Sequence, residues 1–468
     1  MDGDESGKSG TPATFVAAVP KAGRARAATE TSRRDSYGTY LAALPRVFGP
    51  RTTDLQLHNR AFAVLIITAI GLVVVPDLIT YLQVEHSPIL PPGESAAFSE
   101  VPLAQLASLA GSALLLLLST AVALMRGPEN RDITGLLVLL LAVNLPYLVN
   151  PHLPPPADLP KIVLANMFIL ALWNIGAPIA ELKWFPITVA AISVYSLIGG
   201  LLIPEYMMYN VDSQKDIIPG WELAGPFGHA NVLGMYCALA FALVPLIVGT
   251  RWRWVIATIL FVTLLAAASR TALIATAMVL LWWAFCWLRG ATSVRLVGTL
   301  LAGFTATAMF VFPFLDWDPS AFTDRAYVWA ESLRVWQQSP WVGMGVNWFL
   351  VDAQSLSNIA KWAFVGTGHN LVVDTLVRSG LLGVAVLVPL LVAAILSVRA
   401  LRATNQQMAC FGFLMAFFVA ATTEAVWALL PNLQLFPISG LIFAVLILGR
   451  RGTRVDGPPP LEGSIREH

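Results

Sequence analysis

Long apolar runs recur along most of the chain. A bilayer core of about 30 Å is crossed by about 20 apolar residues in helical form. The sequence therefore predicts an all-α, polytopic transmembrane helix bundle of about 12 helices. The runs begin near Ala61, Val101, Ile133, Ile162, Phe185, Ala230, Trp254, Thr271, Val294, Ser379, Met408 and Leu433.

The seventh and eighth runs, 254–268 and 271–288, are separated only by Ser269 and Arg270. A tight turn or a break within the membrane is expected there.

Composition agrees with a membrane protein, since 57% of the 468 residues are hydrophobic and only 12% are charged. The formal net charge of +1 and the lack of a basic stripe exclude nucleic acid as a partner. All three cysteines lie inside apolar runs without CxxC spacing, which indicates packing residues rather than disulfides or a zinc site.

Polar segments flank a membrane domain that spans 55–450. Residues 1–54 are expected to form a disordered cytoplasmic arm, and 451–468 a cytoplasmic tail. Arginine and lysine in alternate short loops place both termini in the cytoplasm. The longest loop, 315–370, lies between the ninth and tenth helices on the outer face. Its residues Arg325, Trp329, Leu333 and Trp336 share one helical face, which is typical of a helix lying on the membrane surface.

Two histidines stand in similar settings on this outer face. His229 in GPFGHAN and His369 in GTGHN each follow glycine, precede an asparagine (Asn231 and Asn370) and open a helix. Imidazole exchanges protons near neutral pH, and helix N-termini attract anions. A phosphate-bearing substrate and an acceptor hydroxyl would fit here. A simple helix cap with a satisfied histidine is the structural alternative.

Three arginines are candidates for holding an anion. Arg270 lies between two apolar runs near the outer interface, where a charge needs a partner or an anionic ligand, unless it extends to lipid headgroups. Arg325 offers a planar fork of donors suited to a diphosphate, although it could instead pair with Asp324 or Glu331. Arg334 has a similar claim, and the sequence does not separate the two.

Two acidic residues near or within the membrane also need an explanation. Asp374 and Arg378 are spaced i,i+4, so we expect them to form a pair that supports the helix mouth and positions His369. Glu424 in AATTEAVW has a polar helix–helix contact as its default role, with function as a secondary possibility.

With these residues in place, the chain resembles the O-antigen ligase and O-antigen polymerase superfamily of bacterial membrane glycosyltransferases. The resemblance spans roughly 220–400 and includes the order of its elements. It rests on GPFGHANVLGMY (225–236), SRTALI (269–274), RAYVWAESLRVWQQSPWVGMGVNWF (325–349) and GHNLVVDTLVRSGLLG (368–383). One departure is Ala230, where the family often has proline.

The resemblance implies transfer of a glycan from a polyprenyl diphosphate carrier to an acceptor hydroxyl at the outer face of a bacterial cytoplasmic (inner) membrane. The acceptor would be a glycan, a lipid or a protein, and membrane lipids would surround the enzyme. Neither a metal nor another cofactor is expected. By similarity, His369 would be the base, and Arg270 and Arg325 would hold the diphosphate. His229, Asn231, Asn370, Asp374 and Arg378 would be supporting residues.

Other functions share the membrane pattern. A twelve-helix secondary transporter or flippase of an anionic or lipid-linked substrate is the main alternative, but the two halves of the chain show no similarity. Another class of polyprenyl-dependent glycosyltransferases uses acidic residues in the first outer loop. That loop holds Glu85, Glu94 and Glu100 but no paired aspartates. Whether the protein ligates a finished glycan or polymerises repeat units stays open.

Overall fold

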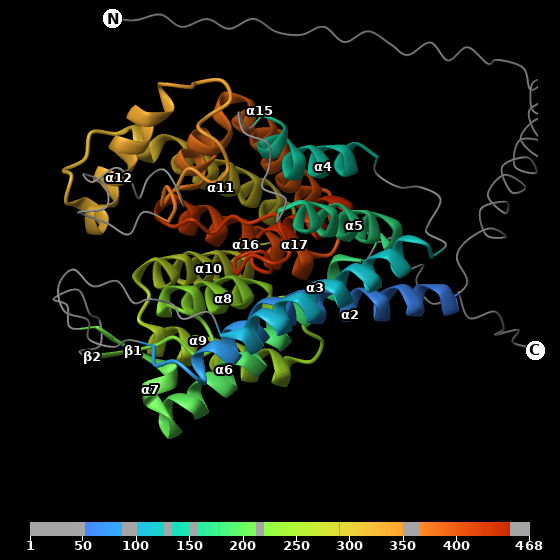
Figure 1. The fold of residues 1–468 in the computed structure, drawn as a ribbon. Coiled ribbons are helices and arrows are strands. Elements are labelled where there is room, and N and C mark those ends of the chain that lie inside the picture. Colours follow the sequence, from blue (N-terminus) through green and yellow to red (C-terminus); the bar gives the residue numbers. More distant parts are fainter. Residues whose placement is uncertain are drawn as a thin grey trace, which may run out of the picture. The chain divides into compact units, whose positions relative to one another are not determined.

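A computed structural model describes residues 52–86, 101–125, 133–149, 158–176, 178–211, 220–289, 291–349 and 366–449 (Figure 1). Residues from Gln56 onward form one compact unit. Positions 1–51 of the predicted arm, the predicted tail 451–468, Glu94 and Glu100, and residues 350–365 of the predicted outer loop lie outside the described ranges.

The described chain is almost entirely helical. Its α-helices are α2 (Thr52–Tyr81), α3 (Pro102–Ala123), α4 (Ile133–Leu148), α5 (Leu159–Ile175), α6 (Trp184–Leu202), α7 (Pro204–Met207), α8 (Ala230–Leu243), α9 (Thr250–Ala267), α10 (Arg270–Leu288), α11 (Ala291–Val311), α12 (Ala321–Trp336), α15 (Leu371–Arg399), α16 (Thr404–Thr423) and α17 (Gly440–Leu448). Short 3-10 helices are η2 (Ile179–Lys183), η3 (Val244–Leu246) and η4 (Phe312–Phe314).

Eight helices in the described ranges are long and apolar enough to cross a membrane. Each of the other predicted runs also contains a helix, but α4, α5 and α8 are shorter and α17 has nine residues. The polytopic helical bundle is therefore confirmed, whereas the count of twelve spans is not. The last run begins as turns, so its helix starts at Gly440 instead of Leu433.

The predicted break between the seventh and eighth runs is a tight turn. Helix α9 ends at Ala267, and Ala268 takes a left-handed conformation with φ of 50° before α10 begins at Arg270. This turn brings the start of α10 back toward the end of α9.

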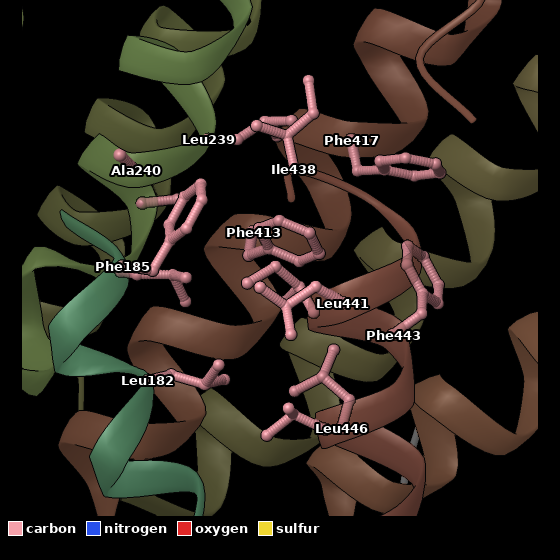
Figure 2. Close-up of a cluster of buried hydrophobic side chains, with 14 of the residues drawn as sticks. Leu182, Phe185, Leu239, Ala240, Phe413, Phe417, Ile438, Leu441, Phe443 and Leu446 are labelled. Carbon is pink, nitrogen blue, oxygen red and sulfur yellow. The ribbon is translucent and has the colours of Figure 1, made fainter. Parts of the chain in front are cut away.

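Helix α16 is the centre of the bundle and packs against α8, α10, α11 and α15. The membrane span of α16 is 72% buried inside the protein, compared with 17% for that of α3. Helix α17 is buried along its whole length, which is typical of a helix that is apolar all round. Figure 2 shows the contact, where Phe413 and Phe417 of α16 meet Leu441 and Phe443 of α17.

A small antiparallel ribbon precedes α8. Strands β1 (Met208–Val211) and β2 (Gly220–Leu223) pair with Met208 opposite Leu223, in a region where the sequence predicts only a loop. After β2, the backbone N–H groups of Ala224 and Gly225 both donate to the carbonyl oxygen of Met207. The ribbon thereby fixes the chain that leads to His229.

Helix α15 starts eight residues earlier than predicted and is broken at Gly380, where φ is 61° and ψ is −158°. Such dihedral angles are available essentially to glycine alone. Across the break, the N–H groups of Leu381 and Leu382 donate to the carbonyl oxygens of Pro340 and Trp341. A side chain at position 380 would collide with the Trp341 carbonyl group. The first part of α15 is thus a separate short segment that carries the GHN motif.

Helix α12 packs its predicted apolar face against other parts of the protein. Its Trp329 is only 1% exposed and packs with Ala326 and Val373, with Phe312 and Phe322 beside them. The predicted apolar face exists, but the first part of α15 covers it. The face predicted to lie on the membrane surface therefore packs against protein, with Trp329 buried and Trp336 half-buried.

Candidate active site

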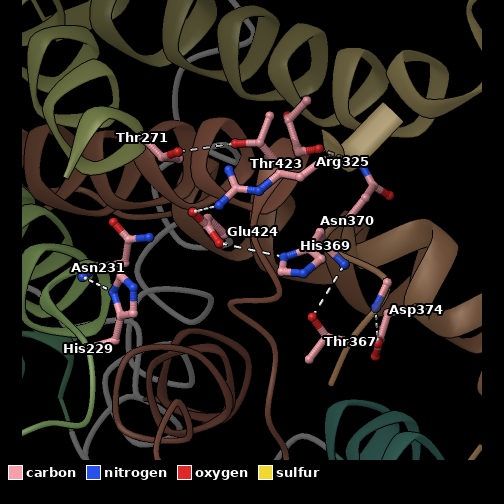
Figure 3. Close-up of polar contacts among 12 residues, drawn as sticks. His229, Asn231, Thr271, Arg325, Thr367, His369, Asn370, Asp374, Thr423 and Glu424 are labelled. Carbon is pink, nitrogen blue, oxygen red and sulfur yellow. Dashed lines mark hydrogen bonds and ion pairs between the residues drawn. The ribbon is translucent and has the colours of Figure 1, made fainter. Parts of the chain in front are cut away.

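Ends of five helices meet around one polar cluster. The starts of α8, α10, α12 and α15 and the end of α16 supply its side chains (Figure 3). A helix start carries a partial positive charge from its free N–H groups. The cluster is therefore set in surroundings that favour an anionic ligand.

Glu424 is the centre of this cluster. Its Oε1 accepts a hydrogen bond from Arg325 Nη2 at 2.6 Å, and its Oε2 lies 4.0 Å from His369 Nδ1 (Figure 3). All three side chains are largely buried, with exposures of 18% for Arg325, 14% for Glu424 and 18% for His369. One carboxylate thus joins the guanidinium group and the imidazole.

In the GHN motif, the asparagine and not the histidine caps the helix that follows. Asn370, not His369, is the N-cap of α15, and its Oδ1 accepts hydrogen bonds from the N–H groups of Val372 and Val373. Its amide nitrogen donates to the carbonyl oxygens of Met309 and Thr422. Asn370 therefore ties α15 to α11 and α16 and leaves the ring of His369 outside the capping interaction.

His369 has a left-handed backbone with φ of 47°, which is uncommon for a residue with a Cβ atom. Trp329 Nε1 donates to the His369 carbonyl oxygen at 3.4 Å, and the N–H of Gly368 donates to Asp374 Oδ1 at 3.1 Å. The fixed backbone on both sides holds this conformation. Strained residues of this kind cluster at functional sites.

The predicted pair on α15 is present, with Arg378 Nε 2.9 Å from Asp374 Oδ2. Because the other oxygen of Asp374 accepts from Gly368, the pair also restrains the loop that carries His369. The sequence-based expectation that Asp374 and Arg378 support the helix mouth is consistent with this geometry.

His229 is itself the N-cap of α8, since its Nδ1 accepts a hydrogen bond from the N–H of Asn231 at 3.0 Å. Burial lowers the pKa of His229 below its ordinary value, and the positive charge of Arg325 lowers it further. The ring is therefore neutral near pH 7, with its proton on Nε2. In this state the N–H on Nε2 can donate one hydrogen bond.

Arg270 is the first residue of α10 and is exposed. No carboxylate of a described residue lies within ion-pair distance of it. The next residue links α10 to the end of α16, because the hydroxyl groups of Thr271 and Thr423 are 3.3 Å apart. The backbone of Arg270 thus lies one residue from this contact.

The structure separates the two arginines that the sequence could not. Arg334 is 69% exposed and pairs with Glu331, one turn away on the same helix. Arg325 pairs with neither Asp324 nor Glu331 but with Glu424, 99 residues further along the chain. Arg325 is therefore the arginine of α12 that joins the cluster.

Glu424 is the residue that sequence reasoning undervalued. An acidic residue at the end of an apolar run was its only signal, and a helix–helix contact was the default interpretation.

Within the described part of the chain, no group of three or more His, Cys, Asp and Glu side chains is arranged to hold a metal ion. The cluster's cationic groups are arginines.

Comparison with known proteins gives a family match over the part of the chain that carries most of this cluster. Residues 254–388 match the family model of the O-antigen ligase, a range that contains Arg270, Arg325 and His369. The exopolysaccharide production protein ExoQ of Rhizobium meliloti (strain 1021) is 26% identical over 261 residues, which cover 48% of this chain and 59% of that protein. The chain thus matches less than two thirds of the length of that relative. The resemblance to the O-antigen ligase and polymerase superfamily is confirmed.

Proposed function

We propose that this multi-pass membrane protein transfers a glycan from a polyprenyl diphosphate carrier to an acceptor hydroxyl during assembly of a cell-envelope polysaccharide or glycolipid. The observation that carries the proposal is the contact of Glu424 with both Arg325 and His369. A counter-charge for a leaving diphosphate and a base for a hydroxyl thus approach different oxygens of one carboxylate. The family match over 254–388 supports it.

The proposed reaction is a single displacement. His369 Nε2 takes the proton of the acceptor hydroxyl while the oxygen forms a bond to the anomeric carbon. The bond from that carbon to the diphosphate oxygen breaks, and polyprenyl diphosphate leaves with the electron pair. The anomeric configuration is inverted. No step in this scheme requires a metal ion, since the arginines carry the counter-charge.

Charge at the cluster suits a diphosphate. Arg270 and Arg325 contribute two positive charges, Glu424 contributes one negative charge, and His229 is neutral. The helix starts add to the positive potential. Buried cationic donors of fixed geometry stabilise the negative charge that develops on a leaving group.

Glu424 would connect donor binding to the base. In the structure its carboxylate is much closer to Arg325 than to His369. A bound diphosphate competes for Arg325 and would release Glu424 to accept a hydrogen bond from His369 Nδ1–H. An imidazole held this way is oriented, and the imidazolium formed in the reaction is stabilised.

Replacing Glu424 with glutamine tests this connection. We expect kcat to fall about 10- to 100-fold because the imidazolium loses its carboxylate. The donor KM should fall or stay unchanged, because Arg325 no longer has a competing anion. Steady-state kinetics on purified protein measure both constants. Glu331→Gln, which removes the exposed partner of Arg334, is the matched control. A Glu424→Gln enzyme with normal kcat would contradict the role.

The overall function is tested with purified protein in a chelator-treated buffer. A polyprenyl-diphosphate-linked oligosaccharide is supplied with glycan, lipid or peptide acceptors, and both released polyprenyl diphosphate and glycosylated product are measured. We expect the two to appear in equal amounts. Movement of the donor across proteoliposome membranes without any transfer would favour the transporter or flippase alternative and overturn the enzyme assignment.

The proposed enzyme has its membrane domain at 55–450, in the cytoplasmic membrane of a bacterium. Both termini would be cytoplasmic, and the cluster would open to the outer face next to the loop 315–370. The concentration of cationic and proton-accepting groups at helix ends supports chemistry at an interface rather than passage through the bundle.

A further inference from the structure

A cavity lies beside the first part of α15 and continues past the break at Gly380. It has a volume of about 250 Å³ and is lined by α4, α15, the start of α5, residues 346–347 and the segment 427–433 that follows Glu424. Two of the segments that line the cavity, α15 and 427–433, adjoin the polar cluster. Asp374 lines the cavity and also accepts from Gly368, the residue before His369.

The end of the cavity near the start of α15 is polar but has no net charge. Asp158 pairs with Lys161 at 2.8 Å, and Asp374 pairs with Arg378 at 2.9 Å. Asn347 and Tyr147 also line the cavity. Two carboxylates and two cations offer acceptors and donors side by side, which matches hydroxyl groups because each both donates and accepts. A phosphate would need uncompensated positive charge, and that is not present here.

The other end is apolar. Val386, Leu387 and Leu390 of α15 line it, together with Val143 of α4 and Leu430. Beyond the break at Gly380, the lining stretch of α15 from Gly383 to Leu390 rises about 10 Å along the helix axis. A ligand that fills the cavity therefore needs a hydroxyl-rich head and a hydrocarbon chain. The volume is slightly below that of sites for drug-sized ligands, so it suits one sugar ring and part of one chain.

We propose that this cavity is the acceptor site and that it binds an uncharged glycolipid. The sugar lies between the Asp158–Lys161 and Asp374–Arg378 pairs, and the chain runs along Val386 to Leu390. The inference rests on the proposed function, because it assigns the acceptor of that reaction. The donor approaches His369 from the side of Arg325, and the acceptor from the side of Asp374.

Photo-crosslinking tests the cavity without requiring turnover. The probe is a monoglucosyl lipid with a diazirine on its chain, incubated with the full-length protein in nanodiscs and mapped by mass spectrometry. We expect labelling within residues 381–390 and 427–433. Val386→Trp, which fills the chain end, should reduce it at least tenfold. Val388→Trp, on the 41% exposed neighbouring face, should leave it unchanged.

A second probe carries a phosphate in place of the sugar. Labelling equal to that of the glucosyl probe, or an unchanged yield in Val386→Trp, would overturn the proposal whether or not the enzyme turns over. Asp158→Asn should weaken labelling by the glucosyl probe, because an amide NH2 donor replaces one carboxylate oxygen acceptor and Lys161 loses its counter-charge. Intact labelling without any glycan transfer would instead count against the proposed function and leave the glycolipid site in place.

Discussion

Replacing His369 with alanine is expected to reduce glycosyl transfer by about 10²- to 10⁴-fold, the usual contribution of a positioned general base. The acceptor hydroxyl is a weak nucleophile until its proton is removed, and the imidazole of His369 lies beside the carboxylate that would stabilise its protonated form. Donor binding should change little because Arg325 remains. Product formation and donor KM, measured in the same assay, separate the two effects.

His229→Gln is the informative comparison for this variant. Its Nδ1 already accepts from the N–H of Asn231, and burial keeps the ring neutral. We therefore expect a loss of about tenfold, the equivalent of one hydrogen bond in the transition state. If His229→Gln inactivates the protein while His369→Ala does not, the two histidines have been assigned in the wrong order. Thermal unfolding in detergent checks that both variants are folded.

The sequence predicts the helical bundle well because apolar runs of membrane length have few other structures available to them. It also predicts the α9–α10 turn and the Asp374–Arg378 pair, which depend on residues close together in the chain. Contacts between residues far apart in the chain were harder to predict. Nothing near Arg325 indicates that its partner is Glu424, and the ordinary local rule favoured Asp324 or Glu331.

The two histidine motifs show the same limit. GHAN and GHN look alike as letters, and each opens a helix, yet one uses His229 as the cap and the other uses Asn370. This shift of one residue decides whether the imidazole ring accepts a hydrogen bond from a backbone N–H at the start of its own helix. That register depends on the contacts of Asn370 with Met309 and Thr422, which no local pattern contains.

Arg325→Ala is expected to lower kcat/KM for the donor by about 10²- to 10³-fold, a loss typical of removing one preorganised donor for developing negative charge. It also leaves the carboxylate of Glu424 buried without its cation. Arg325→Lys should recover only part of the activity, because an ammonium group supplies a point charge and not a planar fork. Arg334→Ala, at an exposed position on the same helix, should behave as wild type.

The double variant Arg325→Ala with Glu424→Gln separates the two causes of this loss. If the unpaired carboxylate repels the diphosphate, removing its charge should restore donor binding by about tenfold relative to Arg325→Ala alone, a non-additive result typical of residues in contact. If Arg325 acts only by contacting the diphosphate, the fold-losses of the two single variants should multiply in the double variant. Full activity in Arg325→Ala would exclude both and would leave Arg270 as the arginine to test for the leaving group.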